Sequence, residues 1–167
     1  MKSMKMTVNF NLNGKNVTAE VAPHQTLLDI LRSQFHLGGA RETCSQGLCG
    51  VCTVYVSGNP VSSCLYMAPA VDGEEVVTIE GLSKADGTLD PVQQGFYNKK
   101  AFQCGYCTPG MILMAKKLLT ENPNPSNEEI MDYMSGNICR CASYQQIIEA
   151  IHEGAKLLKE KDTIGIR

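Results

Sequence analysis

The sequence of 167 residues contains no tryptophan, and aromatic residues make up only 6% of it. Positive and negative charges nearly cancel, with a formal net charge of -2, so the chain lacks the basic surface that nucleic acids require. It also lacks an apolar run long enough to span a membrane, a signal-peptide core at its start and a twin-arginine pair. We therefore expect a cytoplasmic protein with no nucleic-acid partner and no membrane insertion.

The common arrangements of catalytic side chains are absent as well. The sequence has no Ser–His–Asp order, no paired-carboxylate signal and no phosphate-binding glycine loop. Its three histidines, His24, His36 and His152, are isolated along the chain, and we expect each to be a surface or packing residue. The sequence thus predicts no catalytic residue on this chain.

The N-terminal half has the pattern of a β-rich domain. Apolar and polar residues alternate over 8–12, which is the period of a half-buried strand, and Asn13-Gly14 predicts a tight turn before a return strand over 17–21. Further expected elements are a helix over 27–35 capped by Thr26, strands over 52–56 and 61–65 joined by a turn at 57–60, and a last strand over 76–79.

From Thr88 onward the pattern becomes helical. Helices are expected over 90–98, 109–120, 126–134 and 144–159. We place the boundary near 82–90 and predict an α+β protein, with a sheet domain over residues 1–84 followed by an all-α domain over residues 85–167.

Eight cysteines divide between these halves, four in each. In a reducing compartment such cysteines favour metal binding over disulfides. The N-terminal set has the spacing C-x4-C-x2-C-x11-C, which is the spacing of plant-type ferredoxins that bind one [2Fe-2S] cluster through four thiolates. This set consists of Cys44, Cys49, Cys52 and Cys64.

The C-terminal set has the less familiar spacing C-x2-C-x31-C-x-C. Both of its pairs precede predicted helices, so two helix N-termini are expected to point backbone N–H groups toward one anionic cluster. A C-x2-C pair is also common in zinc sites, and the spacing alone leaves zinc and [2Fe-2S] equally open. This set consists of Cys104, Cys107, Cys139 and Cys141.

Three phrases carry a resemblance to a known family: Cys49-Gly-Val-Cys-Thr-Val, Gln103-Cys-Gly-Tyr-Cys-Thr-Pro-Gly-Met and Gly136-Asn-Ile-Cys-Arg-Cys. Over residues 5–155 the chain resembles the iron–sulfur subunit of the xanthine dehydrogenase family of molybdenum hydroxylases. The resemblance implies a ferredoxin-like β-grasp domain, a C-terminal four-helix domain and a [2Fe-2S] cluster in each.

The same resemblance implies partners for this chain. A large molybdopterin-binding subunit would lie beside the C-terminal set, with Gln103 and the Cys141 sulfur contacting the pterin. An FAD-binding medium subunit would face the N-terminal set. Electrons would then pass from molybdopterin through the two clusters to FAD or another acceptor.

Some residues differ from those usual in the family's sequence motifs. Thr43 and Ser45 flank Cys44 where glycine is commoner, and Ala142-Ser143 stands where the family usually has Thr-Gly. Hydroxyls at Thr43, Ser45 or Ser143 could donate to cluster sulfur and raise a reduction potential. We expect instead that these hydroxyls face solvent.

The substrate of the complex is not encoded in a motif of this chain. From the overall resemblance we expect a purine or another N-heterocycle, and the alternatives are an aldehyde, carbon monoxide or an aromatic acyl-CoA. Two other functions also remain open. One is a free-standing ferredoxin, although such a protein needs only the first cysteine set. The other is an interaction module that binds zinc and has no redox function. The colour and the metal content of the purified protein would distinguish this module from an iron–sulfur protein.

Overall fold

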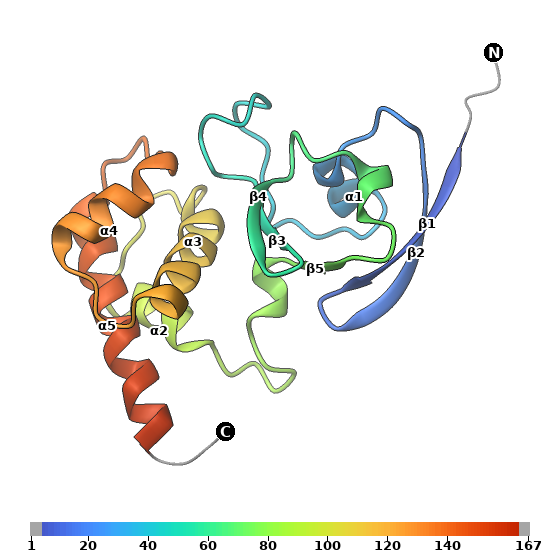
Figure 1. The fold of residues 1–167 in the computed structure, drawn as a ribbon. Helices are drawn as coiled ribbons and strands as arrows, with labels where there is room; N and C mark the ends of the chain where they lie inside the picture. The colour runs from blue at the N-terminus through green and yellow to red at the C-terminus, as the bar shows by residue number, and fades with distance from the viewer. Residues whose placement is uncertain (1–4, 164–167) are drawn as a thin grey trace.

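The computed structural model describes residues 5–163, and these form a sheet with one helix on one side and a group of four helices on the other (Figure 1). Residues 1–4 and 164–167, at the outer ends of the two predicted domains, lie outside the described residues. The α+β class expected from the sequence is confirmed.

The first two strands form a hairpin. β1 (Met6–Leu12) and β2 (Lys15–Val21) pair antiparallel, with Leu12 opposite Lys15. The turn residues Asn13 and Gly14 both have positive φ, 52° and 80°, which is the geometry of the twist-compatible two-residue hairpin turn. The predicted hairpin is confirmed.

Three further strands complete a five-stranded mixed sheet in the order β2-β1-β5-β3-β4. β3 (Thr53–Val56) pairs antiparallel with both β4 (Asn59–Ser62) and β5 (Glu75–Val77), whereas β5 runs parallel to β1. The last strand of the sheet therefore inserts beside the first one, as the ferredoxin-like expectation requires.

One strand was predicted in the wrong place. β4 spans Asn59–Ser62 rather than 61–65, because Ser57 and Gly58 alone make the turn, with φ of 47° and 76°. Pro60 lies opposite Tyr55 in this strand, and a residue without an N–H is tolerated there because β4 is an edge strand. Cys64 consequently lies in the segment after the strand.

The predicted strand over 76–79 also ends early. β5 stops at Val77, and Ile79 lies in the short 3₁₀ helix η2 (Ile79–Gly81). The Asn13 side-chain oxygen accepts a hydrogen bond from the Thr78 N–H at 2.9 Å, so a side chain replaces the strand partner at this point.

Each half has its own apolar core. α1 (Leu27–Ser33) packs on the sheet, and its buried residues Leu27, Ile30 and Leu31 join the inward side chains of the strands. A second 3₁₀ helix, η1 (Ala68–Val71), covers the same core. A separate cluster of buried side chains lies among the four helices.

The helical half contains α2 (Pro91–Asn98), α3 (Thr108–Glu121), α4 (Asn127–Tyr133), the short 3₁₀ helix η3 (Met134–Gly136) and α5 (Tyr144–Thr163). Asp90 and Ser126 cap α2 and α4 with reciprocal capping boxes, which confirms the predicted helix starts. The expected four-helix region is thus present.

Helices α2 and α5 lie in close contact. A Cβ built on Gly95 would lie 2.5 Å from the Ala150 carbonyl oxygen and 2.8 Å from the Gly154 nitrogen. Only glycine permits this approach, so the residue type at 95 determines how tightly the two helices pack.

The two halves meet where α3 packs against β3. The Tyr55 side chain reaches from β3 to α3 and donates its hydroxyl to the Leu113 carbonyl oxygen. Burial raises the pKa of this phenol well above its ordinary value. Tyr55 therefore stays protonated and serves as a hydrogen-bonding contact between the halves.

Candidate metal centres

All eight cysteines carry free thiols. Cys49, Cys52, Cys64 and Cys139 are buried, Cys104 is exposed, and the others are intermediate. Each set contains at least one cysteine that is partly or fully open to the surface, Cys44 in the first and Cys104 in the second. A redox group held by these thiols would therefore reach the surface on its open side.

Three cysteines of the N-terminal set lie on the irregular loop between α1 and β3, and the fourth, Cys64, follows β4. Ser45, Gly47 and Gly50 have φ of 52°, 72° and 66°, so the backbone bends repeatedly through the left-handed region. These bends turn N–H groups inward, and the Gln46 N–H lies 3.5 Å from the Cys44 sulfur. Backbone N–H groups of this kind stabilise a thiolate and the sulfurs of a cluster.

The thiols of this set interact in two pairs. Hydrogen bonds from the Gln46 backbone and then from the Cys49 thiol lower the pKa of Cys44 to about 6. Burial, followed by its contact with Cys52, raises the pKa of Cys64 to about 11. Cys44 thus lies beside Cys49, and Cys52 beside Cys64.

The C-terminal set also forms two pairs. The Cys141 and Cys104 sulfurs lie 3.5 Å apart although the two residues are 37 positions apart in the sequence. Burial, and then the Cys139 thiol, raise the pKa of Cys107 to about 12. Burial acts to raise the pKa of Cys139 as well, but hydrogen bonds from Ser143 and Cys107 outweigh it and leave that pKa lowered.

Two helices begin at this set, as the sequence predicted. Cys107 is the residue before the first turn of α3, and α5 begins three residues after Cys141. Helix N-termini present unpaired N–H groups and favour negative charge nearby.

The donor chemistry fits a two-iron cluster. Each set offers four thiols as two neighbouring pairs, and a [2Fe-2S] cluster takes two ligands at each of its two irons. Within residues 5–163, no three His, Cys, Asp or Glu side chains converge closely enough to hold a single metal ion. The arrangement of the four thiols of each set as two separate pairs is the feature that matches a [2Fe-2S] cluster.

The two residues expected to contact a pterin lie together. Gln103 is exposed, and its side-chain amide donates to the Cys141 carbonyl oxygen at 3.0 Å. That bond holds the Gln103 side chain against the exposed edge of the C-terminal set.

Hydrogen bonds between the halves join the two cysteine loops directly. The Ile138 N–H donates to the Cys49 carbonyl oxygen at 3.0 Å, and the buried Asn137 amide donates to the Gly50 carbonyl oxygen at 3.1 Å. A Cβ on Gly50 would lie 2.5 Å from that amide nitrogen. Cys49 is part of this seam and Cys139 lies one residue from it, so the two sets are held at a fixed separation.

A second contact between the halves involves Arg41 and Tyr106. The Arg41 guanidinium donates to the Gly105 carbonyl oxygen at 2.7 Å and lies 5.1 Å from the centre of the Tyr106 ring. The Tyr106 hydroxyl donates back to the Glu42 carbonyl oxygen at 2.7 Å. Sequence reasoning missed Arg41, Tyr106 and Asn137, because only long-range pairing shows what they contact.

One expectation about the hydroxyl side chains was wrong. Thr43 and Ser45 are exposed, as expected, and the Ser45 hydroxyl donates to the Glu42 carboxylate at 2.7 Å. Ser143, however, is only 2% exposed. It is buried because it directly precedes α5, whose apolar face packs into the helical core.

The histidines lie away from both sets. His24, His36 and His152 are all exposed, and His152 pairs with the Asn127 side chain at 2.7 Å. Their surface positions agree with the interpretation from sequence.

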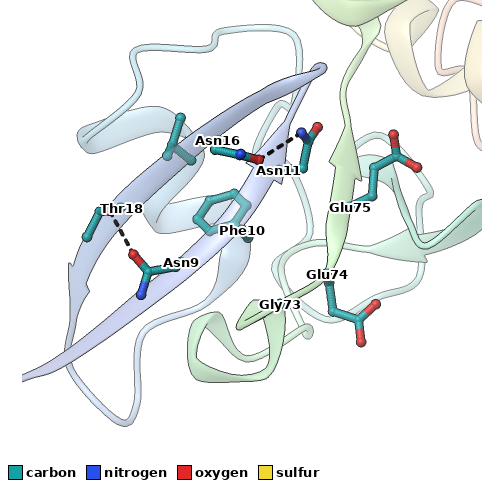
Figure 2. Close-up of a pocket in the computed structure, with 9 residues that line it drawn as sticks. Asn9, Phe10, Asn11, Asn16, Thr18, Gly73, Glu74 and Glu75 are labelled. Atoms are coloured by element: carbon teal, nitrogen blue, oxygen red, sulfur yellow. Dashed lines mark hydrogen bonds between the residues drawn. The ribbon is translucent and has the colours of Figure 1, made fainter.

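A hollow of about 410 Å³ lies on the outer face of β1 and β2 and is bordered by the Gly73–Glu75 segment (Figure 2). Its amides pair with neighbours across the strands: Thr18 donates to Asn9 at 2.8 Å, and Asn11 to Asn16 at 3.2 Å. These are cross-strand contacts that stabilise the sheet, and no cysteine lines the hollow.

Within the described residues no helix is both long and apolar enough to cross a bilayer.

Comparisons with known proteins agree with the two halves. The family model for a 2Fe-2S iron-sulfur cluster binding domain matches residues 10–79, and the model for a [2Fe-2S] binding domain matches residues 78–152. The chain is 48% identical over 147 residues to the nicotinate dehydrogenase small FeS subunit of Eubacterium barkeri, covering 88% of this chain and 93% of the relative.

Two further comparisons extend this likeness. The nicotine 6-hydroxylase small subunit of Paenarthrobacter nicotinovorans is 42% identical, over 89% of each chain. Among solved structures, a chain of quinoline 2-oxidoreductase from Pseudomonas putida 86 has a TM-score of 0.88 and 40% identity, covering 93% of this chain and 97% of that one. With two cluster-binding domains and relatives of this kind along almost its whole length, the chain belongs to the family of electron-transferring iron–sulfur subunits of molybdenum hydroxylases, which carry two [2Fe-2S] clusters.

Proposed function

We propose that this chain is the electron-relay subunit of a molybdenum hydroxylase that oxidises an N-heterocycle, and that its eight cysteines are the ligands of its two clusters. The observation that carries the ligand assignment is the pairing of thiols within each set, above all the 3.5 Å approach of Cys104 and Cys141. Cysteines so distant in sequence come together this closely when they share a function at one site.

The residues of the chain have distinct tasks at these sites. When bound, the clusters supply one-electron transfer without proton or group transfer. The left-handed turns at Ser45 and Gly47 direct N–H groups toward the Cys44 sulfur, and the starts of α3 and α5 do the same for the C-terminal set. These donors stabilise negative charge on sulfur, and the Asn137–Gly50 seam holds the two sites at a constant distance.

The partners we propose follow from apolar side chains that surround each open cysteine. Phe102, Tyr106 and Ile138 are 42%, 43% and 49% exposed beside the C-terminal set. We assign this face to a large molybdopterin-binding subunit, with Gln103 and Cys141 contacting the pterin.

A second apolar rim surrounds the N-terminal set. Leu48, Leu65 and Met67 are 67%, 58% and 42% exposed there. Large apolar side chains that stay exposed in a group are typical of protein interfaces. We assign this rim to an FAD-binding subunit, or to an external electron acceptor where no such subunit exists.

The substrate class is inferred from relatives whose names refer to nicotinate, nicotine and quinoline, all of which contain an aromatic ring nitrogen. We propose a substrate of that class for the complex, with the chemistry performed on the large subunit.

We also place the complex in the cytoplasm, where thiol ligands stay reduced until metal is inserted. We propose two domains divided at residues 84 and 85. The two separate apolar cores support the presence of two domains, and Ile79 and Leu82, just before the proposed division, pack against the C-terminal core.

The test is to isolate the chain with its partners under anaerobic conditions. About four irons per chain and two distinct signals in the reduced-state EPR spectrum are expected. Colourless protein that contains zinc, or a spectrum with one cluster only, would refute the ligand assignment. Hydroxylation of nicotinate-like and purine substrates, with no turnover of aldehydes, is the expected result of a substrate panel, and the reverse would refute the substrate class.

A further inference from the structure

Two buried side-chain oxygens in the described part of the chain have no hydrogen-bond partner, and both lie next to the C-terminal set. They belong to Thr108, which directly follows Cys107, and to Ser143, which follows Cys141 by two residues. A hydroxyl buried without a partner is unfavourable, so one that persists beside a cysteine set points to an acceptor that is in place once the cluster is bound.

Ser143 does not have the role that its position suggests. It immediately precedes α5, where a serine ordinarily accepts a hydrogen bond from a backbone N–H of the first helical turn. Thr26, Asp90 and Ser126 do this at the starts of α1, α2 and α4. The Ser143 oxygen makes no such bond, so its hydroxyl is not committed to capping the helix.

Ser143 lies beside Cys139. The Ala142 N–H donates to the Cys139 carbonyl oxygen at 3.3 Å, and the Cys139 N–H donates to the Tyr144 hydroxyl at 2.9 Å, so the residues on both sides of Ser143 are bonded to Cys139. Cys139 is itself only 7% exposed, and Ser143 is 2% exposed. Water is therefore largely excluded from the space between them.

From this arrangement we propose that Ser143 donates a hydrogen bond to the sulfur that Cys139 presents to the helical-domain cluster, and that this bond raises the reduction potential of that cluster. The proposal rests on the ligand assignment made above. A donor aimed at sulfur favours the reduced state because that state carries one more negative charge.

The experiment is a redox titration of the purified complex, followed by the EPR signals of the two clusters. Ser143→Ala is expected to move the midpoint of one signal to lower potential and leave the other unchanged. A tenfold change in electron partition between the clusters corresponds to about 59 mV for a one-electron couple, and a shift of about this size is expected. Ser143→Thr keeps the hydroxyl and is expected to restore the original potential.

A matched control tests whether any hydroxyl near a cysteine would have the same effect. Thr43→Ala removes an exposed hydroxyl directly before Cys44, and neither signal is expected to shift. Ser143→Gly serves as a second variant if the alanine variant does not load iron, and it is expected to lower the same signal.

The outcomes separate this proposal from the ligand assignment. Two intact clusters with unchanged midpoints in Ser143→Ala would overturn the role of Ser143 and leave the ligands untouched. A shift of both signals together would also overturn it, because that would indicate a general structural change. Failure of the unaltered complex to contain two clusters would refute the ligand assignment itself.

Discussion

The two cysteine sets contain the same four donor groups on different scaffolds. The N-terminal set is gathered within a single loop and the segment just after β4, and its backbone bends by left-handed residues such as Gly47 and Gly50. The C-terminal set is assembled from two segments 31 residues apart, each followed by a helix. The first site therefore depends on local backbone geometry, whereas the second depends on the packing of α3 against α5.

The largest effect expected from this comparison is the selective loss of one cluster. Cys139→Ser should abolish the EPR signal of the helical-domain cluster and leave about two irons per chain, because serine is a poor substitute for a thiolate ligand. Cys49→Ser should remove the other signal instead. Iron analysis and EPR of both variants test the assignment, and loss of both signals in either variant would show that the sites do not load independently.

Gly50 connects the two scaffolds, and its substitution should affect both. Gly50→Ala places a Cβ at a φ of 66° and 2.5 Å from the Asn137 amide nitrogen, so we expect a loss of about 3 kcal/mol in the free energy of unfolding. Gly58→Ala is the matched control, because Gly58 has a similar φ of 76° but open space around it. Its expected cost is about 1 kcal/mol, measured by denaturant unfolding, and equal losses would contradict a packing role for Gly50.

A substitution at Ala142 should strengthen the C-terminal scaffold. Ala142 has a φ of 59°, which an L side chain adopts at a cost, so Ala142→Gly is expected to stabilise the protein by about 1 kcal/mol. Ala115→Gly, in the middle of α3, should destabilise it instead. Thermal unfolding of the two variants checks the sign, and destabilisation by both would contradict the strain at Ala142.

The smallest effect concerns the stability of the helical half at alkaline pH. Burial, and then the Glu121 carboxylate that accepts its hydroxyl at 2.9 Å, raise the pKa of Tyr133 to about 12. Because this pKa is raised above the ordinary value of 10, the stabilisation is complete below pH 10 and is lost as pH rises toward 12. Tyr133→Phe should flatten the pH dependence of the melting temperature in that window, and an unchanged slope would contradict the assignment.

Much of the fold follows from local sequence signals. Asn13-Gly14 gave the hairpin, and the capping boxes at Asp90 and Ser126 gave the starts of two helices, because each signal acts over a few residues. The misplaced strand over 61–65 shows the limit of such signals. Its position depended on the two-residue turn at Ser57-Gly58 and on pairing with β3, and neither is visible from apolar alternation.

The cysteine spacing by itself established two groups of four sulfur donors and, with the neighbouring motif residues, the family. Spacing carries this information because the ligands of one loop must reach the same pair of irons. The tertiary structure alone decided which thiols are neighbours, that Asn137 and Ile138 join one cysteine loop to the other, and that Ser143 is buried rather than exposed. These features depend on contacts between segments far apart in the chain, where burial and hydrogen-bond partners are set by packing and no local pattern records them.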